Sequence, residues 1–307
     1  MVRFLSSNFS ANSLGAIFMM LSMAGFVLND TLIKLVAGQL SLFQAILIRG
    51  VFACVFMAML CYALGAFRVS SDGGGGVWRA LAHPTVWWRT IGEAGGTFFF
   101  LSALFQMPIA NVTAVLQILP LTITLAAALF LGEKVGWKRY GAIVAGFLGV
   151  LLIVKPGTEG FNFYAIYAVI ATLFITMRDL VTRKMPKSIP SLLVSLVTAI
   201  TITLMGAIGS LFEPWTPPNS YQIMVLLSAA AILMVGYIFS ILAMREGEVS
   251  FIAPFRYSIL IWALILGYLV FGDVPDTITV IGAIIVVASG LFTFYRERFV
   301  AKNSATS

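Results

Sequence analysis

The sequence predicts an all-α integral membrane protein in which ten transmembrane helices form two inverted five-helix repeats. Three observations lead to this fold class: the composition, ten apolar runs of spanning length, and an internal repeat. Of the 307 residues, 60% are hydrophobic and 10% are charged, whereas a soluble domain is about 25% charged. A soluble protein could not cover so much apolar surface with polar groups, so a bilayer must cover it.

Each of the ten expected helices is an apolar run. A membrane-spanning helix needs about 20 predominantly apolar residues. Such runs lie at 14–36, 41–66, 86–107, 109–132, 137–155, 161–182, 190–212, 221–243, 249–271 and 276–295. Turn residues such as Pro108, Pro156 and Pro217 separate neighbouring runs. The runs use most of the chain, which leaves no long polar segment for a separate soluble domain.

The positions of Lys and Arg predict that both termini are cytoplasmic. With the N-terminus inside, thirteen basic residues fall on the inner side and only Lys155 falls on the outer side. The thirteen are Arg3, Arg68, Arg79, Lys134, Lys138, Arg139, Arg183, Lys184, Lys187, Arg245, Arg296, Arg298 and Lys302.

The chain contains an internal repeat, with expected halves at residues 1–156 and 157–307. Matches at an offset of 140 residues pair Gly96 with Gly236, Ala103 with Ala243, Val112 with Ile252 and Gly132-Glu133 with Gly272-Asp273. Each half holds five helices, and because five is odd the second half must enter the membrane from the opposite side. Inverted repeats of this kind are typical of secondary transporters, which place a substrate site near the midplane.

Motifs around the fourth run carry a family resemblance. A tight turn at Pro108 leads into this run, Pro120 lies within it, Gly132-Glu133 ends it, and Gly141-Ala142-Ile143 opens the next run. In a five-plus-five repeat this pattern resembles the EamA family of the drug/metabolite transporter superfamily, over essentially the whole chain. The second half departs from the pattern, because Leu260 replaces Pro120, Asp273 replaces Glu133 and Pro254 appears earlier. The two fourth helices should therefore bend differently.

The resemblance implies a carrier in the cell inner membrane. Asn29, Asp30 and Lys34 at the end of the first run, followed by Arg49, are similar to members that import S-adenosylmethionine or riboflavin, and members with other substrates share the pattern. We expect a secondary active transporter that moves a small polar organic metabolite by alternating access. No ATP-binding motif is present, so a gradient or exchange must supply the energy.

Polar residues inside the runs are the candidate site, since a charge at the centre of a membrane helix costs at least about 2.5 kcal/mol. The candidates for substrate binding or gating are Asn29, Asp30, Lys34, Arg49, Arg89, Glu93, Gln117, Arg178, Asp179, Tyr237, Arg256 and Tyr257, with helix kinks at Pro120 and Pro254. Their excess of positive charge favours an anionic or zwitterionic solute.

Arg256 lies seven residues into the ninth run, beside the helix-breaking Pro254. It could clamp a substrate anion or form a buried ion pair between helices. Gln117 maps onto Tyr257 in the repeat, so both are expected to face one central cavity.

Two charged groups lie in the first half. Asp30 could bridge to Lys34 or to Arg49, either as an outer gate or as a structural staple. Glu93, four residues after Arg89, is the best candidate for a proton-coupling carboxylate, and an intrahelical pair with Arg89 is the alternative.

The second half repeats the first group near the inner end of the sixth run, where Arg178, Asp179 and Arg183 are expected to form the inner counterpart. Residues this close to the cytoplasm can also simply reach water. In the third run, Gly92 and Gly96 are expected to form a flat packing strip.

Other classes of function compete with a carrier. An intramembrane protease usually needs His, and His83 is the only one. A channel would need a filter or a ring of like charges, and neither is visible. A flippase for a lipid-linked or amphipathic substrate could use the same fold, and a lateral opening would be its signature. We expect no metal, no cofactor and no nucleic-acid partner; membrane lipids are expected partners. The stripe Ala142/Gly146 and Ala145/Gly149 predicts helix packing or a homodimer.

Overall fold

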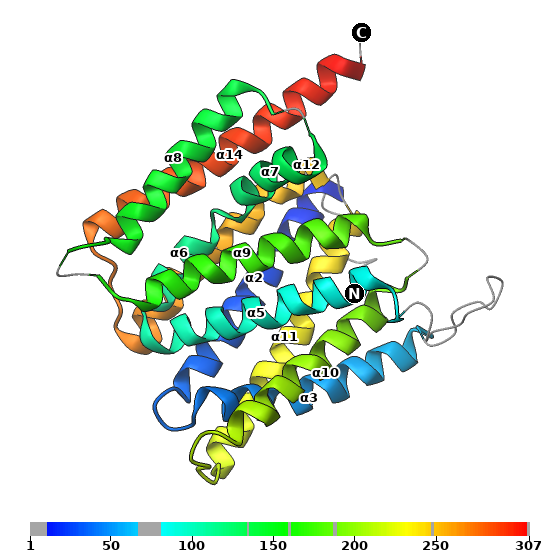
Figure 1. The fold of residues 1–307 in the computed structure, drawn as a ribbon, viewed down its shortest axis with the longest axis vertical. Coiled ribbons are helices and arrows are strands. Elements are labelled where there is room, and N and C mark those ends of the chain that lie inside the picture. The colour runs from blue at the N-terminus through cyan, green and yellow to red at the C-terminus, as the bar shows by residue number, and fades with distance from the viewer. Residues whose placement is uncertain are drawn as a thin grey trace. The chain divides into compact units, whose positions relative to one another are not determined.

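The computed structural model describes residues 11–66, 81–133, 135–158, 161–186, 189–246 and 249–305, and these residues are mainly helical (Figure 1). The elements are α2 (Ala11–Leu35), α3 (Leu42–Ala63), α5 (Pro84–Gln106), α6 (Ile109–Leu116), α7 (Leu119–Leu131), α8 (Trp137–Val154), α9 (Tyr164–Lys184), α10 (Ser191–Ser210), α11 (Ser220–Glu246), α12 (Val249–Ile252), the 3₁₀ turn η2 (Ala253–Tyr257), α13 (Ser258–Leu266), the π turn η3 (Gly267–Phe271) and α14 (Thr277–Ala305). Each of the ten expected runs contains helix.

The prediction of an all-helical membrane protein is confirmed. Among the described residues, nine helical segments are long and apolar enough to cross a membrane. The third expected span, α5, falls outside this set. Its sequence explains the difference, because Arg89, Glu93 and three glycines replace apolar side chains in the helix.

The predicted orientation is not tested by these helices. Five of the basic residues on which it depends, Arg3, Arg68, Arg79, Lys134 and Lys187, lie outside the described residues. The cytoplasmic location of both termini therefore stays a prediction.

Two compact units organise the contacts. Unit 1 comprises Met1–Thr31, Met107–Ala165 and Val235–Ser307, and unit 2 comprises Leu32–Gln106 and Ile166–Met234. These units are not the two halves of the sequence repeat, since each unit combines segments from both halves. The repeat boundaries themselves stay a prediction.

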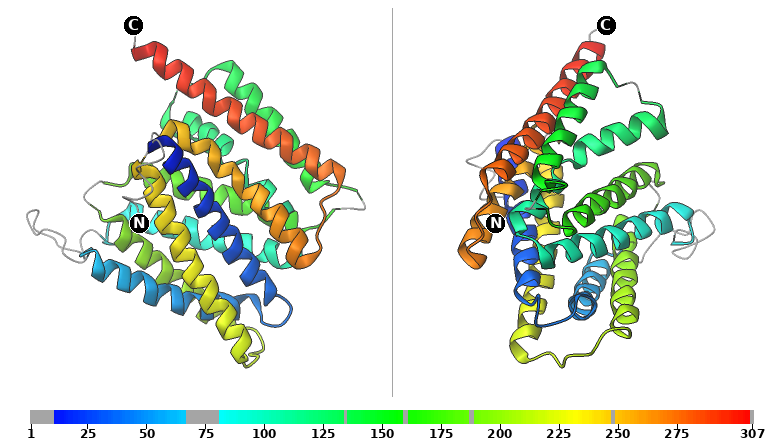
Figure 2. Two further views of the ribbon diagram at one scale, coloured as in Figure 1. Left: turned by 180° about the vertical axis from the view of Figure 1, so that it is seen from behind. Right: turned by 60° about the vertical axis from the view of Figure 1, so that its left-hand side comes forward.

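In unit 2, α3 and α10 pack side by side along their length (Figures 1 and 2). Glycines allow the close approach, because a Cβ atom on Gly206 would lie 2.7 Å from the backbone nitrogen of Leu47. A Cβ on Gly50 would collide with Thr203. Leu47 thus faces Gly206, and the later Gly50 faces the earlier Thr203, so the two helices run antiparallel.

In unit 1, α8 and α14 form a corresponding pair (Figure 1). A Cβ atom on Gly149 would lie 2.8 Å from the carbonyl oxygen of Gly282, and one on Gly282 would lie 2.6 Å from the carbonyl oxygen of Gly149. Gly146 packs against Leu121 and Ser289 in the same unit. The small-residue stripe of α8 is therefore used for packing inside the chain, while the homodimer stays a prediction.

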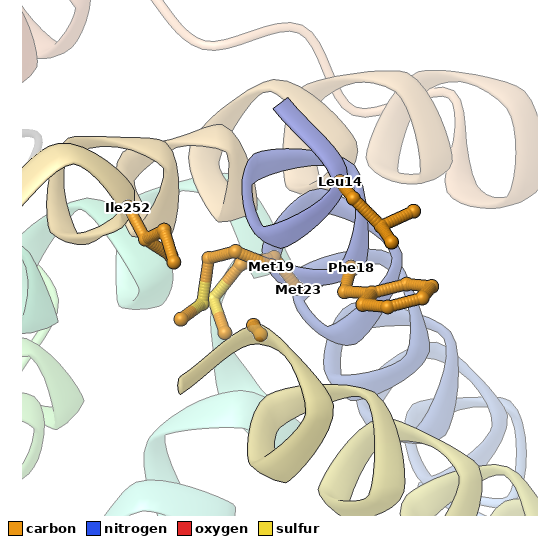
Figure 3. Packing of buried hydrophobic residues seen from close by; sticks show 6 residues of the cluster. Leu14, Phe18, Met19, Met23 and Ile252 are labelled. Atoms are coloured by element: carbon orange, nitrogen blue, oxygen red, sulfur yellow. The ribbon is translucent and has the colours of Figure 1, made fainter. Parts of the chain in front are cut away.

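A second part of unit 1 is an apolar cluster between the first part of α2, the last part of α11 and α12. Its buried members are Leu14, Phe18, Met19, Met23, Ala243 and Ile252 (Figure 3). Ser22 supports the same packing, because its hydroxyl donates a hydrogen bond of 2.8 Å to the carbonyl of Gly236. A bonded hydroxyl is the form in which a polar group is tolerated among apolar helices.

Both helices that contain the predicted proline kinks are interrupted, in different ways. In the first half, α6 ends at Leu116 and α7 begins at Leu119. Pro120 accounts for this break, since proline has no N–H and its ring clashes with the carbonyl four residues earlier, that of Leu116. In the second half, Pro254 lies in the five-residue 3₁₀ turn η2, and a π turn follows α13.

Candidate functional site

Four charged residues of unit 2 form a network between α5 and α9. Arg178 of α9 donates from Nη1 to both carboxylate oxygens of Glu93 on α5, at 3.1 and 3.0 Å. The same guanidinium donates from Nε to Oδ1 of Asp179 at 2.8 Å. Arg89 Nη2 lies 3.8 Å from Glu93 Oε2. The charges of these two arginines and two carboxylates compensate one another.

Hydroxyl groups extend this network to α10. Arg89 Nη1 donates to Oγ1 of Thr198 at 2.9 Å. The Thr198 hydroxyl in turn donates 2.8 Å to the carbonyl of Val194. Thr90 Oγ1 lies 3.3 Å from Thr198 Oγ1, within hydrogen-bond distance. Three helices of unit 2 therefore supply polar atoms to one place.

Glu93 lies deep within α5, whereas Arg178 lies six residues before the end of α9, and both side chains are mostly buried. The side chain of Glu93 is 17% exposed and that of Arg178 is 24% exposed. Glu93 lies nine residues after the start of α5, which is about 14 Å along a helix and close to the middle of a spanning segment. Charges at this depth usually bind or move a solute or a proton.

Glycines on α5 bring α9 close enough for these contacts. A Cβ atom on Gly92 would lie 2.9 Å from Cβ of Arg178, and one on Gly95 would lie 2.5 Å from the Phe174 ring. Gly96 similarly packs against Ile175. The expected flat strip of α5 is present, and its neighbour is α9.

Sequence reasoning placed these four residues in two separate groups, which the structure joins. Glu93 has its short contacts with Arg178 on another helix, and Arg89 within its own helix is more distant. The contribution of Thr198 was missed. Threonine is common in membrane helices, so nothing in the sequence indicated that Thr198 would accept a hydrogen bond from Arg89.

Part of the first charged group lies on α2. Asn29 is buried, and its side-chain amide donates to Oδ1 of Asp30 at 2.9 Å. Asp30 and Lys34 share one face of α2, because the helix is continuous from Ala11 to Leu35. Asp30 belongs to unit 1, whereas Lys34 and Arg49 belong to unit 2. The expected bridge from Asp30 to either cation stays a prediction.

The remaining candidates belong to unit 1, where Gln117, Arg256 and Tyr257 lie at the helix breaks and Tyr237 lies within α11. Gln117, at the end of α6, is buried and donates to the carbonyl of Thr113 at 3.0 Å. Tyr237 makes an edge contact with Phe26, with ring centroids 5.4 Å apart. Arg256 is exposed on η2. Tyr257 and Ser258 each have a buried hydroxyl without a hydrogen-bond partner among the described residues.

A cavity of about 620 Å³ lies in unit 1 beside these breaks. We call it the α13–α14 groove. Its lining is Met20, Ala110, Ala114, Pro254, Phe255, Tyr257, Ser258, Leu260, Ile261, Leu264, Pro275, Thr279, Val280, Ala283, Ile284, Val287, Ala288 and Leu291. Tyr257 thus lines this groove, whereas Gln117 is not among the described lining residues. The volume suits a small molecule, and the lining is almost wholly apolar.

Metal chemistry finds no support in the described residues. Within the ranges that the structure covers, no group of three or more His, Cys, Asp or Glu side chains could hold a metal ion. Cys54 and Cys61 are both free thiols on α3.

Comparison with known proteins adds the family. The EamA-like transporter family matches residues 13–155 and 162–295. The S-adenosylmethionine uptake transporter of Rickettsia prowazekii (strain Madrid E) is 25% identical over 286 residues, covering 92% of this chain and 93% of that protein. The riboflavin transporter of Vibrio cholerae serotype O1 (strain ATCC 39315 / El Tor Inaba N16961) is 30% identical over 194 residues, covering 61% and 63%.

A solved crystal structure shares the fold. It has a TM-score of 0.62 and 18% sequence identity, and the match covers 92% of this chain and 98% of that one. The two matches to the family together extend over most of the sequence, and the protein names point to a transporter and not to an enzyme. The chain therefore belongs to the EamA-like transporter family, as a multi-pass membrane protein.

Proposed function

We propose that the protein is a secondary active carrier for a small zwitterionic metabolite in the cell inner membrane, with both termini cytoplasmic. The observation that carries this proposal is the neutral network of Arg89, Glu93, Arg178 and Asp179 within apolar helices. A structural staple would need one cation and one anion. Two arginines and two carboxylates that share contacts can instead bind both the carboxylate and the ammonium of a zwitterionic solute.

Such a network can exchange internal ion pairs for pairs with the solute. A solute carboxylate would take the place of Glu93 at the Arg178 guanidinium, and a solute ammonium would take the place of Arg178 at Glu93. Each broken pair is replaced by one of the same kind, so no charge is left buried alone. Binding then reorganises contacts between α5 and α9.

A network that holds both signs of charge favours one of the two substrate classes named for the relatives. S-adenosylmethionine has, besides its sulfonium cation, an amino-acid group with one carboxylate and one ammonium that could exchange with the network, whereas riboflavin has no such pair. We infer that an amino-acid-derived or nucleoside-derived solute like S-adenosylmethionine is the better fit to the network.

We also propose that residues 1–156 and 157–307 are inverted repeats of five spans each, which alternate access to the site. The packing in each unit supports this. The antiparallel pair α3 and α10 unites the second helix of each half, and the pair α8 and α14 unites the fifth helix of each half. Helices that a twofold axis in the membrane plane exchanges are antiparallel where they meet.

Transport in proteoliposomes tests the proposal. Uptake of radiolabelled S-adenosylmethionine would be compared for the unchanged protein, Glu93→Gln, and the control Glu133→Gln in an exposed connection. Replacing the carboxylate removes charge-assisted bonds worth about 1.5–3 kcal/mol, so uptake should fall at least about tenfold. Equal loss in the control, or full activity of Glu93→Gln, would contradict the role of the network.

The same variant separates binding from proton coupling. If Glu93 carries the coupling proton, Glu93→Gln should keep solute counterflow and lose the response to an imposed pH gradient. If Glu93 only binds the solute, both activities should fall together. A thermal-stability screen identifies the solute first, because a ligand at one hundred times its Kd stabilises the folded protein by about 2.7 kcal/mol.

A flippase for a lipid-linked or amphipathic substrate is the second candidate. The apolar lining of the α13–α14 groove is the observation that favours it. Protein-dependent movement of a fluorescent lipid between leaflets, with no uptake of S-adenosylmethionine, would replace the first proposal by this one.

A further inference from the structure

The α13–α14 groove extends along α14. Its lining on α14 follows one helix face: Thr279, Val280, Ala283, Ile284, Val287, Ala288 and Leu291. Twelve residues separate the first from the last, which is about 18 Å along a helix. The opposite wall is formed by η2 and α13, from Pro254 to Leu264. A groove of this shape suits an extended chain better than a compact solute.

The groove begins at one end of the spanning segments and ends inside them. Pro275 precedes α14 and Thr279 lies in its first turn, so this end marks the edge of the apolar region. The hydrocarbon core of a bilayer is about 30 Å thick, so one leaflet is roughly half of that. The groove therefore extends over about the depth of one leaflet, from the side of the α13–α14 connection.

The groove is open on a surface that is itself apolar. Ile261 and Ile284, in opposite walls, are 59% and 62% exposed. Exposed apolar side chains continue beyond it on both elements, with Ile265 on α13 and Ile281 on α14. In a membrane protein such a surface faces lipid, so the groove is continuous with the lipid-facing surface.

The walls can offer little to a polar solute. Thr279 cannot donate to a solute, because its hydroxyl already donates to Oδ2 of Asp276 at 2.9 Å. The hydroxyls of Tyr257 and Ser258 are covered. A polar metabolite in the groove would lose its hydration without replacement bonds, whereas an acyl chain loses nothing.

Charged groups lie at the mouth of the groove. Asp276 follows the lining residue Pro275 and accepts a hydrogen bond of 2.5 Å from Nζ of Lys155. These groups are outside the spanning segments, at the level where lipid head groups lie. The pair offers both charges: a lipid phosphate would approach the Lys155 ammonium, and the choline group of a zwitterionic phospholipid would approach the Asp276 carboxylate.

We propose that the α13–α14 groove binds one acyl chain of a bilayer phospholipid, whose head group lies beside Lys155 and Asp276. The chain runs between α13 and α14 and its methyl end lies near Pro254 and Leu291. The groove shares no residue with the charged network of unit 2, so the proposal applies whichever solute the protein carries.

Photo-crosslinking in liposomes tests the proposal. The full-length protein would be reconstituted with a phosphatidylcholine that carries a diazirine near the end of one acyl chain, and labelled peptides would be mapped by mass spectrometry. We expect label to concentrate at the inner end of the groove, near Pro254 and Leu291. The exposed face of α8 around Val144, Leu148 and Leu151 is the internal comparison. Equal labelling of that face would overturn the proposal.

A matched pair of variants gives a second readout. Ala288→Trp places an indole in the groove from an exposed position, whereas Ile281→Trp places one on the exposed surface of the same helix outside it. Label in the groove should fall several-fold in Ala288→Trp and stay unchanged in Ile281→Trp. Val280→Trp replaces Ala288→Trp if that variant does not fold. Unchanged labelling with the groove filled would overturn the proposal.

Transport assays distinguish lipid binding in the groove from solute transport. A bound lipid predicts label in the groove whether or not S-adenosylmethionine is taken up. Rapid protein-dependent transfer of the labelled lipid between leaflets would overturn a resident lipid and make the groove a transport path.

Discussion

The two units differ in how they treat polar groups. Unit 2 connects Arg89, Glu93 and Arg178 with Thr198 through hydrogen bonds that cross from helix to helix. In unit 1 two helices are interrupted, the hydroxyls of Tyr257 and Ser258 have no hydrogen-bond partner within the described ranges, and α13 and α14 border an apolar groove. Helices of similar apolar composition thus hold paired charges in one unit and line an apolar groove in the other.

The largest expected effect tests whether close helix packing is essential to unit 1. Gly149→Leu would force a side chain against the carbonyl of Gly282, whereas Gly141→Leu on the same helix meets open space. Overpacking of this kind costs about 3 kcal/mol in the free energy of unfolding. Thermal unfolding in detergent would measure it. Similar melting temperatures for the two variants would show that α8 and α14 can separate without cost.

A second prediction concerns the pairing in unit 2. Arg178→Met leaves Glu93 buried with only the distant Arg89, and we expect a loss of about 2 kcal/mol in stability, less than for a fully buried pair. Adding Glu93→Gln should recover part of this loss, since it removes the uncompensated charge. A double-mutant cycle on unfolding free energies measures the coupling. Additive effects would mean that the two side chains do not interact.

The unpaired hydroxyl of unit 1 predicts an effect of the opposite sign. Tyr257→Phe removes a buried hydroxyl that has no partner among the described residues, so stability should rise by about 1 kcal/mol. Thr198→Val, which removes a bonded hydroxyl from unit 2, should lower it by about the same amount. Melting temperatures of the two variants in one buffer make the comparison. A loss on Tyr257→Phe would indicate that the hydroxyl has a partner.

The smallest effect is a pH dependence at the mouth of the groove. The hydrogen bond from Lys155 holds the pKa of the Asp276 carboxyl well below its usual range. A lowered pKa contributes stability above the ordinary pKa of the carboxyl, and this stability is lost as the pH falls toward the folded-state value. Because Asp276 is half exposed, the pair is worth at most about 1 kcal/mol.

Asp276→Asn is the matched variant for this test, since Asn keeps an oxygen that can cap α14 at the backbone nitrogens of Ile278 and Thr279. The difference in melting temperature between the unchanged protein and the variant should be greatest near pH 7 and shrink toward pH 3. A constant difference would mean that the charge of Asp276 is irrelevant and that only its cap contributes.

The sequence predicted the membrane class and the helices well, because apolar composition and turn residues act locally. Ten runs were expected and each contains helix, with ends shifted by a few residues. The glycines of α5 predicted a close neighbour without identifying α9. The helix against which α5 packs is set by tertiary contacts, and a single sequence does not show which helices come into contact.

The candidate site was predicted in part for the same reason. Spacing four residues apart placed Arg89 near Glu93 on one helix. Nothing local connects Glu93 to Arg178, which lies 85 residues later. The groove was not foreseen, since its walls are ordinary apolar residues whose arrangement arises only when η2 and α14 pack. Its floor includes Ala110 and Ala114, which looked like any other small residues.

The composition of α5 has a consequence for how the chain is made. This helix carries Arg89 and Glu93, and it lacks a window apolar enough to cross the membrane by itself. Its charged partners lie on α9 and its hydroxyl partner on α10, both of which leave the ribosome much later. Stable insertion of α5 therefore waits for the second half of the polypeptide. A nascent chain stopped before α9 should leave α5 accessible to water, and one that includes α10 should protect it.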